Sequence, residues 1–161
     1  MLFHIGDQIA HPMHGAGVIA GVEKRKMDGI ERDYYVLQLP SGGMQVMIPV
    51  SSCESVGVRP IVDEREADRI LQAIPGIQIE MTSNWNKRYR DNMQKIKSGD
   101  LIEVASVIKG LMLRDSERGL STGERKMLHS AKQILISELV LSKNCSYDEI
   151  EQELLAAVNP S

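Results

Sequence analysis

The stretch Val56-Gly57-Val58-Arg59-Pro60 divides this 161-residue chain into two parts with different hydrophobic patterns. Before it, short apolar runs alternate with turn residues, as they do in β-strands. After it, from Asp63 onward, apolar residues recur every three or four positions, as they do in helices. We therefore predict an α+β protein with a β-domain over residues 1–59 and an all-helical domain over residues 60–161.

The N-terminal part is expected to contain four short strands, over residues 5–12, 15–22, 34–39 and 44–49. Asp28-Gly29 supplies the positive φ angles of a hairpin turn, and Ser41-Gly42-Gly43 is a second turn. In the last strand Met44, Val46 and Ile48 share one face. Short strands and many glycines predict a small, strongly bent antiparallel barrel of SH3 or Tudor type, with no helix before about residue 62.

The C-terminal part is expected to contain about five helices, over residues 63–74, 83–97, 100–114, 121–142 and 146–158. Three of them open with a Ser or Asp followed three residues later by Glu, at Asp100, Ser121 and Ser146. Such capping boxes satisfy backbone N–H groups that the first helical turn leaves unbonded.

Composition is typical of a soluble globular protein, at 42% hydrophobic and 25% charged residues. The longest nearly apolar stretch, residues 134–141, is too short to cross a bilayer, and no signal peptide is evident. Only two cysteines are present, Cys53 and Cys145, without the spacing of a metal or redox motif. We expect a cytoplasmic protein that does not bind a membrane.

The net charge of −3 conceals an uneven distribution of charge. Residues 1–82 carry 7 basic and 11 acidic side chains, residues 83–132 carry 11 and 6, and residues 133–161 carry 1 and 5. A basic segment between two acidic ones suggests contact with nucleic acid, although a solvated helical surface explains the same charges.

No motif for catalysis or cofactor binding stands out. Gly15-Ala16-Gly17 lacks the third glycine and the following helix of a dinucleotide-binding loop. His11 and His14 have no third metal ligand near them, and Cys53 has no basic neighbour in sequence to activate it. We expect no cofactor, no metal and no enzymatic activity.

The only tryptophan, Trp85, precedes a basic run in Asn84-Trp85-Asn86-Lys87-Arg88-Tyr89-Arg90. Trp85 shares one helical stripe with Tyr89, Met93 and Ile96, which favours a place in the core. However, Trp85 lies in the first turn, where a side chain can overhang the helix end. An indole there could stack on a base or wedge into a base step, and periodicity alone leaves both interpretations open.

Three separated motifs make the chain resemble the CarD (CdnL) family of bacterial transcription regulators. They are Phe3-x-x-Gly6-Asp7-x-x-x-x-Pro12-x-His14-Gly15, Asn84-Trp85-x-x-Arg88-Tyr89, and Arg114-Asp115-Ser116-Glu117-Arg118-Gly119-Leu120-Ser121-x-Gly123-Glu124-x-x-Met127-Leu128. The similarity covers essentially residues 1–158.

The resemblance implies an accessory factor of RNA polymerase. In members of that family, a Tudor-like domain, similar to one in transcription-repair coupling factors, docks on the polymerase β subunit. Their helical domain touches promoter DNA at the upstream edge of the transcription bubble, and the resemblance implies the same for this chain. By the resemblance, Trp85 is a minor-groove wedge that helps to hold the promoter open. The basic residues implied or suggested as DNA contacts are Lys87, Arg88, Arg90, Arg125, Lys126 and Lys132.

For polymerase docking, Arg25 matches a basic position of the family, while Met47 stands where some relatives carry an arginine. DNA binding is expected to be weak and largely non-specific, and the protein is expected to be a monomer. The alternative is a stand-alone protein-interaction module with a dimerising helical domain.

Overall fold

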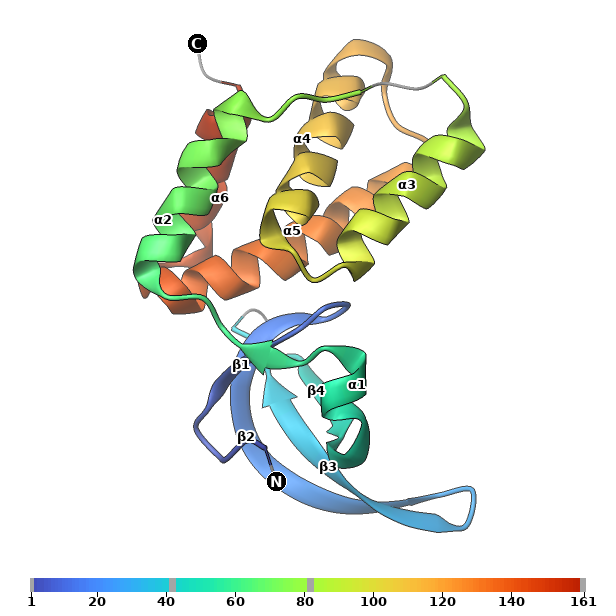
Figure 1. Cartoon of the computed structure of the whole chain (residues 1–161), viewed down its shortest axis with the longest axis vertical. Helices are drawn as coiled ribbons and strands as arrows, with labels where there is room; N and C mark the ends of the chain where they lie inside the picture. Colours follow the sequence, from blue (N-terminus) through green and yellow to red (C-terminus); the bar gives the residue numbers. More distant parts are fainter. Residues whose placement is uncertain (1, 41–42, 81–82, 160–161) are drawn as a thin grey trace.

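The computed structural model describes residues 2–40, 43–80 and 83–159. A bent β-sheet forms one half of the molecule and a group of helices forms the other (Figure 1). This arrangement confirms the predicted α+β fold with an N-terminal sheet and a C-terminal helical domain. None of the helices in the described ranges is long and apolar enough to cross a membrane.

The sheet has five strands in the order β4-β3-β2-β1-β5, and all neighbours are antiparallel. Their bounds are β1 Gln8–His11, β2 Gly15–Met27, β3 Ile30–Gln38, β4 Gln45–Pro49 and β5 Arg59–Pro60. The strand β5 was not predicted, because two residues are too few to show an alternating pattern. It spans the predicted domain boundary between residues 59 and 60.

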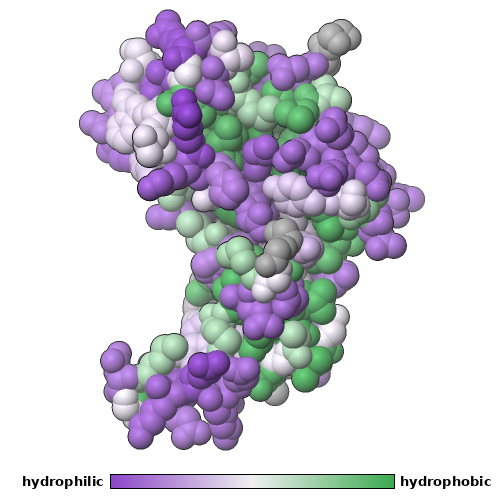
Figure 2. Space-filling view, turned by 180° about the vertical axis from the view of Figure 1, so that it is seen from behind, coloured by the Kyte–Doolittle hydropathy of each residue, from purple (hydrophilic) through white to green (hydrophobic). Residues whose placement is uncertain are grey.

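The long hairpin of β2 and β3 turns at Asp28 and Gly29, whose φ angles are 52° and 78°. Two positive φ angles in succession define the expected hairpin turn. Both strands extend further toward the turn than predicted, because residues 23–33 are exposed and, apart from Met27, Gly29 and Ile30, charged, so they lack an apolar alternation. This end of the hairpin projects from the molecule and its surface is mostly hydrophilic (Figure 2).

Between β4 and β5 the chain forms a 3-10 turn, η1 (Val50–Ser52), and a short helix, α1 (Cys53–Val56). The prediction of no helix before about residue 62 was therefore wrong, because one helical turn shows no period of 3.6 residues. Helix α1 ends at Gly57, which has a φ of 97°.

The sheet curls around a core of its own (Figure 1). Its buried members are Ile9, Ile19, Tyr35, Leu37, Leu39, Ile48, Cys53 and Val58. Val46 and Ile48 share the face of β4 that packs on this core, whereas Met44, predicted to lie on the same face, precedes the strand and is exposed. The predicted turn at Ser41 and Gly42 lies outside the described residues.

Five α-helices follow, with one 3-10 turn, η2 (Ile74–Gly76), after the first of them. They are α2 Glu64–Ala73, α3 Trp85–Lys97, α4 Leu101–Arg118, α5 Thr122–Lys143 and α6 Tyr147–Val158. The three predicted capping boxes are present, since Asp100, Ser121 and Ser146 each accept from the backbone N–H of the Glu three positions on. Helix α4 ends four residues later than predicted, because the residue that stops it is Gly119, with a φ of 78°.

Helix α5 crosses between the sheet and the other helices (Figure 1). Its segment 134–139 is buried at every position, including Ser137 and Glu138. A helix buried on all sides must have neighbours on all sides, and here the sheet covers one side while α2, α4 and α6 cover the others.

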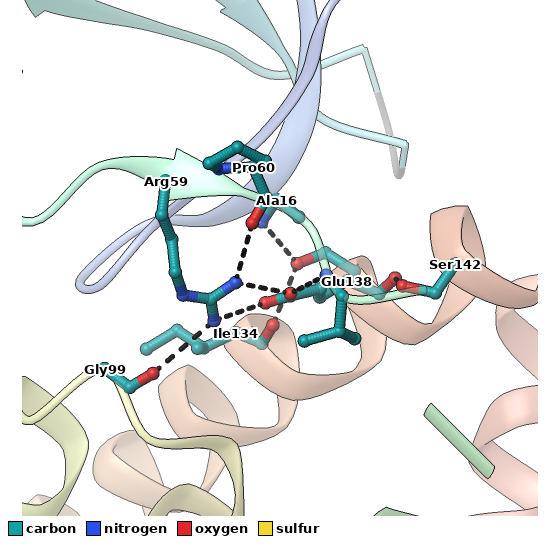
Figure 3. A network of polar contacts seen from close by, with 9 residues as sticks. Ala16, Arg59, Pro60, Gly99, Ile134, Glu138 and Ser142 are labelled. Carbon is teal, nitrogen blue, oxygen red and sulfur yellow. Dashed lines mark hydrogen bonds and ion pairs between the residues drawn. The ribbon is translucent and has the colours of Figure 1, made fainter. Parts of the chain in front are cut away.

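Two close contacts join α5 to the sheet (Figure 3). The backbone N–H of Ala16 donates to Oγ of Ser137 at 2.9 Å. The neighbouring Gly15, with a φ of 94°, leaves room for this approach, because a Cβ there would lie 2.5 Å from the same oxygen. In the second contact the Arg59 guanidinium of β5 pairs with the Glu138 carboxylate.

Candidate nucleic-acid interface around Trp85

Trp85 is the first residue of α3, and the capping residue before it, Asn84, fixes where the helix begins. The Asn84 side chain accepts a hydrogen bond from the backbone N–H of Lys87 at 3.1 Å, so the helix starts at Trp85, two residues before the basic run. Trp85 itself is 43% exposed. Trp85 is therefore outside the core, and the core interpretation left open by periodicity is wrong for this residue.

The rest of the stripe shows why the pattern was ambiguous. Ile96, near the other end of α3, is buried, while Tyr89 and Met93 are partly buried against the helical core. Burial along this stripe thus decreases from Ile96 toward the start of the helix, and Trp85 is its exposed end. Its ring stacks on Tyr89, with ring centroids 5.1 Å apart and planes inclined by 19°. Residues four positions apart are neighbours on a helix surface, so this spacing brings the two rings together.

The start of α5 supplies the other supports of the indole. Trp85 Nε1 donates to Oγ of Ser121 at 3.2 Å. A Cβ added to Gly123 would lie 3.7 Å from Cζ2 of Trp85 and 3.8 Å from Cε2 of Tyr89, so the backbone there borders both rings. Sequence reasoning identified Ser121 only as a helix cap, because a contact between residues 36 positions apart leaves no periodic signal.

Lys87 and Arg90 are exposed on α3, two and five residues after Trp85. Lys87 also forms an ion pair with Asp91 one turn further on, at 3.0 Å. Arg90 forms no ion pair within the part of the chain that the structure describes. Both cations can reach solvent, and Arg90 is the one whose charge is not already balanced by a neighbour.

Arg88 differs from its neighbours in sequence, because it points into the protein. It is 7% exposed, and its Nε donates to Oε2 of Glu124 at 2.9 Å. Burial disfavours the charged form of the Glu124 carboxyl, but the hydrogen bond and charge of Arg88, with bonds from Ser121, outweigh it and lower the pKa of Glu124. In this arrangement Arg88 is not accessible to a DNA phosphate, so its predicted phosphate contact is revised to an internal ion pair.

The three basic candidates of α5 differ in their position along the helix. Arg125 and Lys126 are exposed in the first turns of α5, the part of that helix that meets Trp85. Lys132 lies about two turns further on and is paired with Glu151 of α6 at 3.4 Å. Trp85 thus packs at the start of α5, which carries Arg125 and Lys126, while Lys132 borders the same surface hollow as Arg125.

The two candidates for polymerase docking lie on the sheet but at different levels. Arg25 is in the exposed extension of the hairpin, paired with Glu23 at 2.9 Å. Met47 on β4 pairs in register with Val36, whereas Arg25 is opposite Arg32. Four residues of β3 thus separate the two levels, about 13 Å along the strand.

The residues considered for metal binding or catalysis do not form a reactive cluster. His11 and His14 have ring centroids 4.5 Å apart, and burial together with the charge of His14 lowers the pKa of His11 to about 4. Burial raises the pKa of the Cys53 thiol. Within the described ranges, no group of three or more His, Cys, Asp or Glu side chains is placed to hold a metal ion.

Comparison with known proteins agrees with this division of the molecule. Residues 3–62 match the family model of the CarD-like/TRCF RID domain, an RNA polymerase-interacting domain. Residues 69–155 match the model of the CarD C-terminal domain. A protein of Bacillus subtilis (strain 168), "Putative transcription factor YdeB", is 36% identical over 150 residues, which cover 93% of this chain and 98% of that protein. With both domain models matched in order and a relative similar along its whole length, the chain belongs to the CarD family of transcription factors.

Proposed function

We propose that this protein docks on the β subunit of RNA polymerase through its sheet and stabilises the open promoter complex through the surface around Trp85. The match of residues 3–62 to a polymerase-interacting domain supports the first half of the proposal. The observation that carries the second half is the 43% exposed indole, held at the start of a helix that also carries the exposed cations Lys87 and Arg90. A tryptophan so placed can meet the edge of an opened duplex without leaving a cavity in the core.

Docking uses the sheet, with Arg25 and Met47 as its candidate contacts. Arg25 offers a cation at the exposed hairpin extension, although it forms an ion pair with Glu23. Met47 offers an apolar, polarizable side chain that adapts to the shape of a partner. We infer that this pair makes polymerase docking depend more on apolar contact than on charge.

The DNA contact is weak by itself and becomes effective through docking. A few cations such as Arg90, Arg125 and Lys126 give non-specific binding with a Kd of about 10⁻⁴–10⁻⁶ M. Docking on polymerase supplies an effective DNA concentration of up to about 1 mM. Against a Kd of about 10⁻⁴ M, this concentration favours the bound state by roughly ten to one. Polymerase thus determines where on the DNA the contact forms.

The wedge would act by contacting DNA that only the open state offers. Stacking of one aromatic ring on a base contributes about 1–3 kcal/mol. If the contact is absent in the closed state, the equilibrium shifts toward the open state by about 5- to 150-fold. No ATP hydrolysis and no covalent step is required.

The test is the lifetime of the promoter open complex with the Trp85→Ala variant. We expect the variant to fold normally, because the side chain is half exposed, and to lose most of the added lifetime. Leu155→Ala is the matched control, because Leu155 is a similarly exposed apolar residue on α6. A Trp85→Ala variant that keeps the full effect on lifetime overturns the wedge.

The single tryptophan also reports directly on the contact. Its fluorescence should change when promoter DNA and polymerase are both added, and change little with DNA alone. Unaltered fluorescence in the complete complex would contradict a contact between the indole and DNA.

A further inference from the structure

Two parallel contacts connect the first turn of α3 to the start of α5. Trp85 bonds to Ser121 at 3.2 Å and Arg88 bonds to Glu124 at 2.9 Å. In each helix the two partners are three residues apart, so they lie on one face, one turn above the other. The basic run and the capping box, which the sequence presents as separate motifs, form one unit.

The Ser121 hydroxyl uses its full hydrogen-bonding capacity in this unit. It accepts from the backbone N–H of Glu124 at 3.2 Å and from the Trp85 indole, and it donates to Oε1 of Glu124 at 3.2 Å. A hydroxyl has one donor and two acceptor positions, so all three are occupied. Because a hydroxyl that donates to a carboxylate becomes a stronger acceptor, the Glu124 charge strengthens the bond to the indole.

The same capping box at α6 shows that helix capping does not require an indole. Ser146 accepts from the backbone N–H of Glu149 at 3.1 Å and contacts Oε1 of Glu149 at 3.3 Å. These distances match those at α5, yet no ring N–H bonds to Ser146 within the described part of the chain. The additional bond of Ser121 is therefore specific to the Trp85 site.

The bond to Ser121 and the stack on Tyr89 fix the indole at an edge and at a face. With these contacts made, Trp85 is still 43% exposed. A side chain ordered before binding loses less conformational entropy when it binds, so the contact retains more of its free energy. A ring held in this way is preorganised for binding in the free protein.

We infer that Ser121, supported by Glu124 and Arg88, is a positioning residue that holds the Trp85 indole in its DNA-contacting orientation. The inference rests on the proposed function. Because the indole N–H is already bonded to Ser121, the ring meets DNA through its apolar surface and reads no base by hydrogen bonding. The wedge should therefore tolerate any base at the site of contact.

The first test examines the free protein, without DNA or polymerase. The lone indole gives one Nε1–H signal in a ¹⁵N–¹H NMR spectrum, and its hydrogen exchange reports whether the N–H is bonded. Ser121→Ala should accelerate this exchange roughly 2- to 12-fold, the range expected for one hydrogen bond. Ser146→Ala is the matched control and should leave the rate unchanged, while Ser121→Thr keeps the hydroxyl and should restore protection. Equal exchange in wild type and Ser121→Ala overturns the inference.

Glu124→Gln tests the supporting carboxylate, with Glu149→Gln in α6 as its control. We expect the indole signal to shift and its exchange to accelerate only in Glu124→Gln. Thermal melts of each variant establish that the measurements are made on folded protein. An indole signal that is identical in Glu124→Gln and wild type removes Glu124 from the positioning unit.

A second test measures open-complex lifetime and separates the inference from the proposed function. Ser121→Ala should shorten the lifetime in the wild-type background and have no further effect in the Trp85→Ala background. If it shortens the lifetime equally in both backgrounds, Ser121 does not act through Trp85. If Trp85→Ala itself has no effect on lifetime, the proposed function fails, whereas the exchange result still decides whether Ser121 holds the ring.

Discussion

Arg59 and Glu138 form a bidentate ion pair between the sheet and α5, with Nη1–Oε2 at 2.7 Å and Nη2–Oε1 at 3.0 Å (Figure 3). The Glu138 residue is 1% exposed and also accepts from the backbone N–H of Val62 at 2.9 Å. The guanidinium reaches further, to the carbonyl of Gly99 at 3.4 Å. One ion pair thus joins β5, the chain that leaves the sheet, the α3–α4 connection and α5.

Replacing Arg59 should reveal how strongly this pair stabilises the protein. Arg59→Ala leaves the Glu138 carboxylate buried without its cation, and such losses cost about 3–5 kcal/mol in free energy of unfolding. Urea denaturation measures this difference. The control is Arg69→Ala, which breaks the exposed pair of Arg69 with Glu66 and should change the free energy of unfolding by less than about 1 kcal/mol. Equal losses for the two variants would contradict a structural role of the Arg59 pair.

The close approach at Gly15 leads to a second prediction. A Cβ at this position would lie 2.5 Å from Oγ of Ser137, at a φ of 94° that disfavours side chains. Gly15→Ala should therefore destabilise the protein by at least about 1–3 kcal/mol. Gly21→Ala is the control, because nothing lies within 4 Å of a Cβ there and no positive φ is involved. Thermal unfolding compares the two, and similar melting temperatures would mean that the sheet and α5 separate at little cost.

The internal pair of Arg88 and Glu124 should make stability depend on pH. The pKa of Glu124 is lower in the folded protein than its ordinary value of 4.5, so its contribution to stability is present above that pH. The contribution is lost as pH falls through the lowered folded-state pKa. The free energies of unfolding of wild type and Glu124→Gln should therefore differ near neutral pH and converge in acid, which denaturation at a series of pH values measures. A constant difference between the two proteins at all pH values would contradict this coupling.

Arg88 and Arg90 should behave differently although they are two residues apart. Arg90→Ala should weaken the binding of polymerase-free DNA and lower the slope of log K against log salt by about 0.9, with stability unchanged, if Arg90 neutralises one phosphate. Arg88→Ala should instead cost about 3–5 kcal/mol of stability, because it removes the short ion pair of the buried Glu124 and leaves it only the longer contact with Arg114 at 3.9 Å. Salt-dependent DNA binding and denaturation of both variants check the pair of expectations. A loss of stability in Arg90→Ala, or none in Arg88→Ala, would reverse the assignment of their roles.

Local signals in the sequence predicted most elements of the fold. The capping boxes at Asp100, Ser121 and Ser146 and the turn at Asp28-Gly29 act over a few residues, and the structure has each of them. The extension of the hairpin and the two-residue strand β5 were missed, because neither buries an alternating set of side chains. Strand pairing holds them in place, and pairing partners are distant in sequence.

The candidate site was predictable in composition but not in arrangement. Sequence indicated Trp85 and the cations that follow it, yet it gave Arg88 and Arg90 the same role. Only the packing of α3 on α5 separates them, since one faces Glu124 and the other faces solvent. The bond of Trp85 to Ser121 depends on the same packing, which no periodicity reports.

Helix α5 contacts the indole at one end and the sheet further along, so its length sets a fixed spacing between the two. From Ser121 to Glu138 the chain rises about 25 Å at 1.5 Å per residue. A one-residue insertion between them would move one end by about 1.5 Å and turn it by about 100° relative to the other. Side chains along this stretch can change with little effect on the spacing, whereas the number of residues cannot. In a complex docked through the sheet, the length of α5 would thus set the distance from the docking surface to the indole, and so the base step at which the indole meets the DNA.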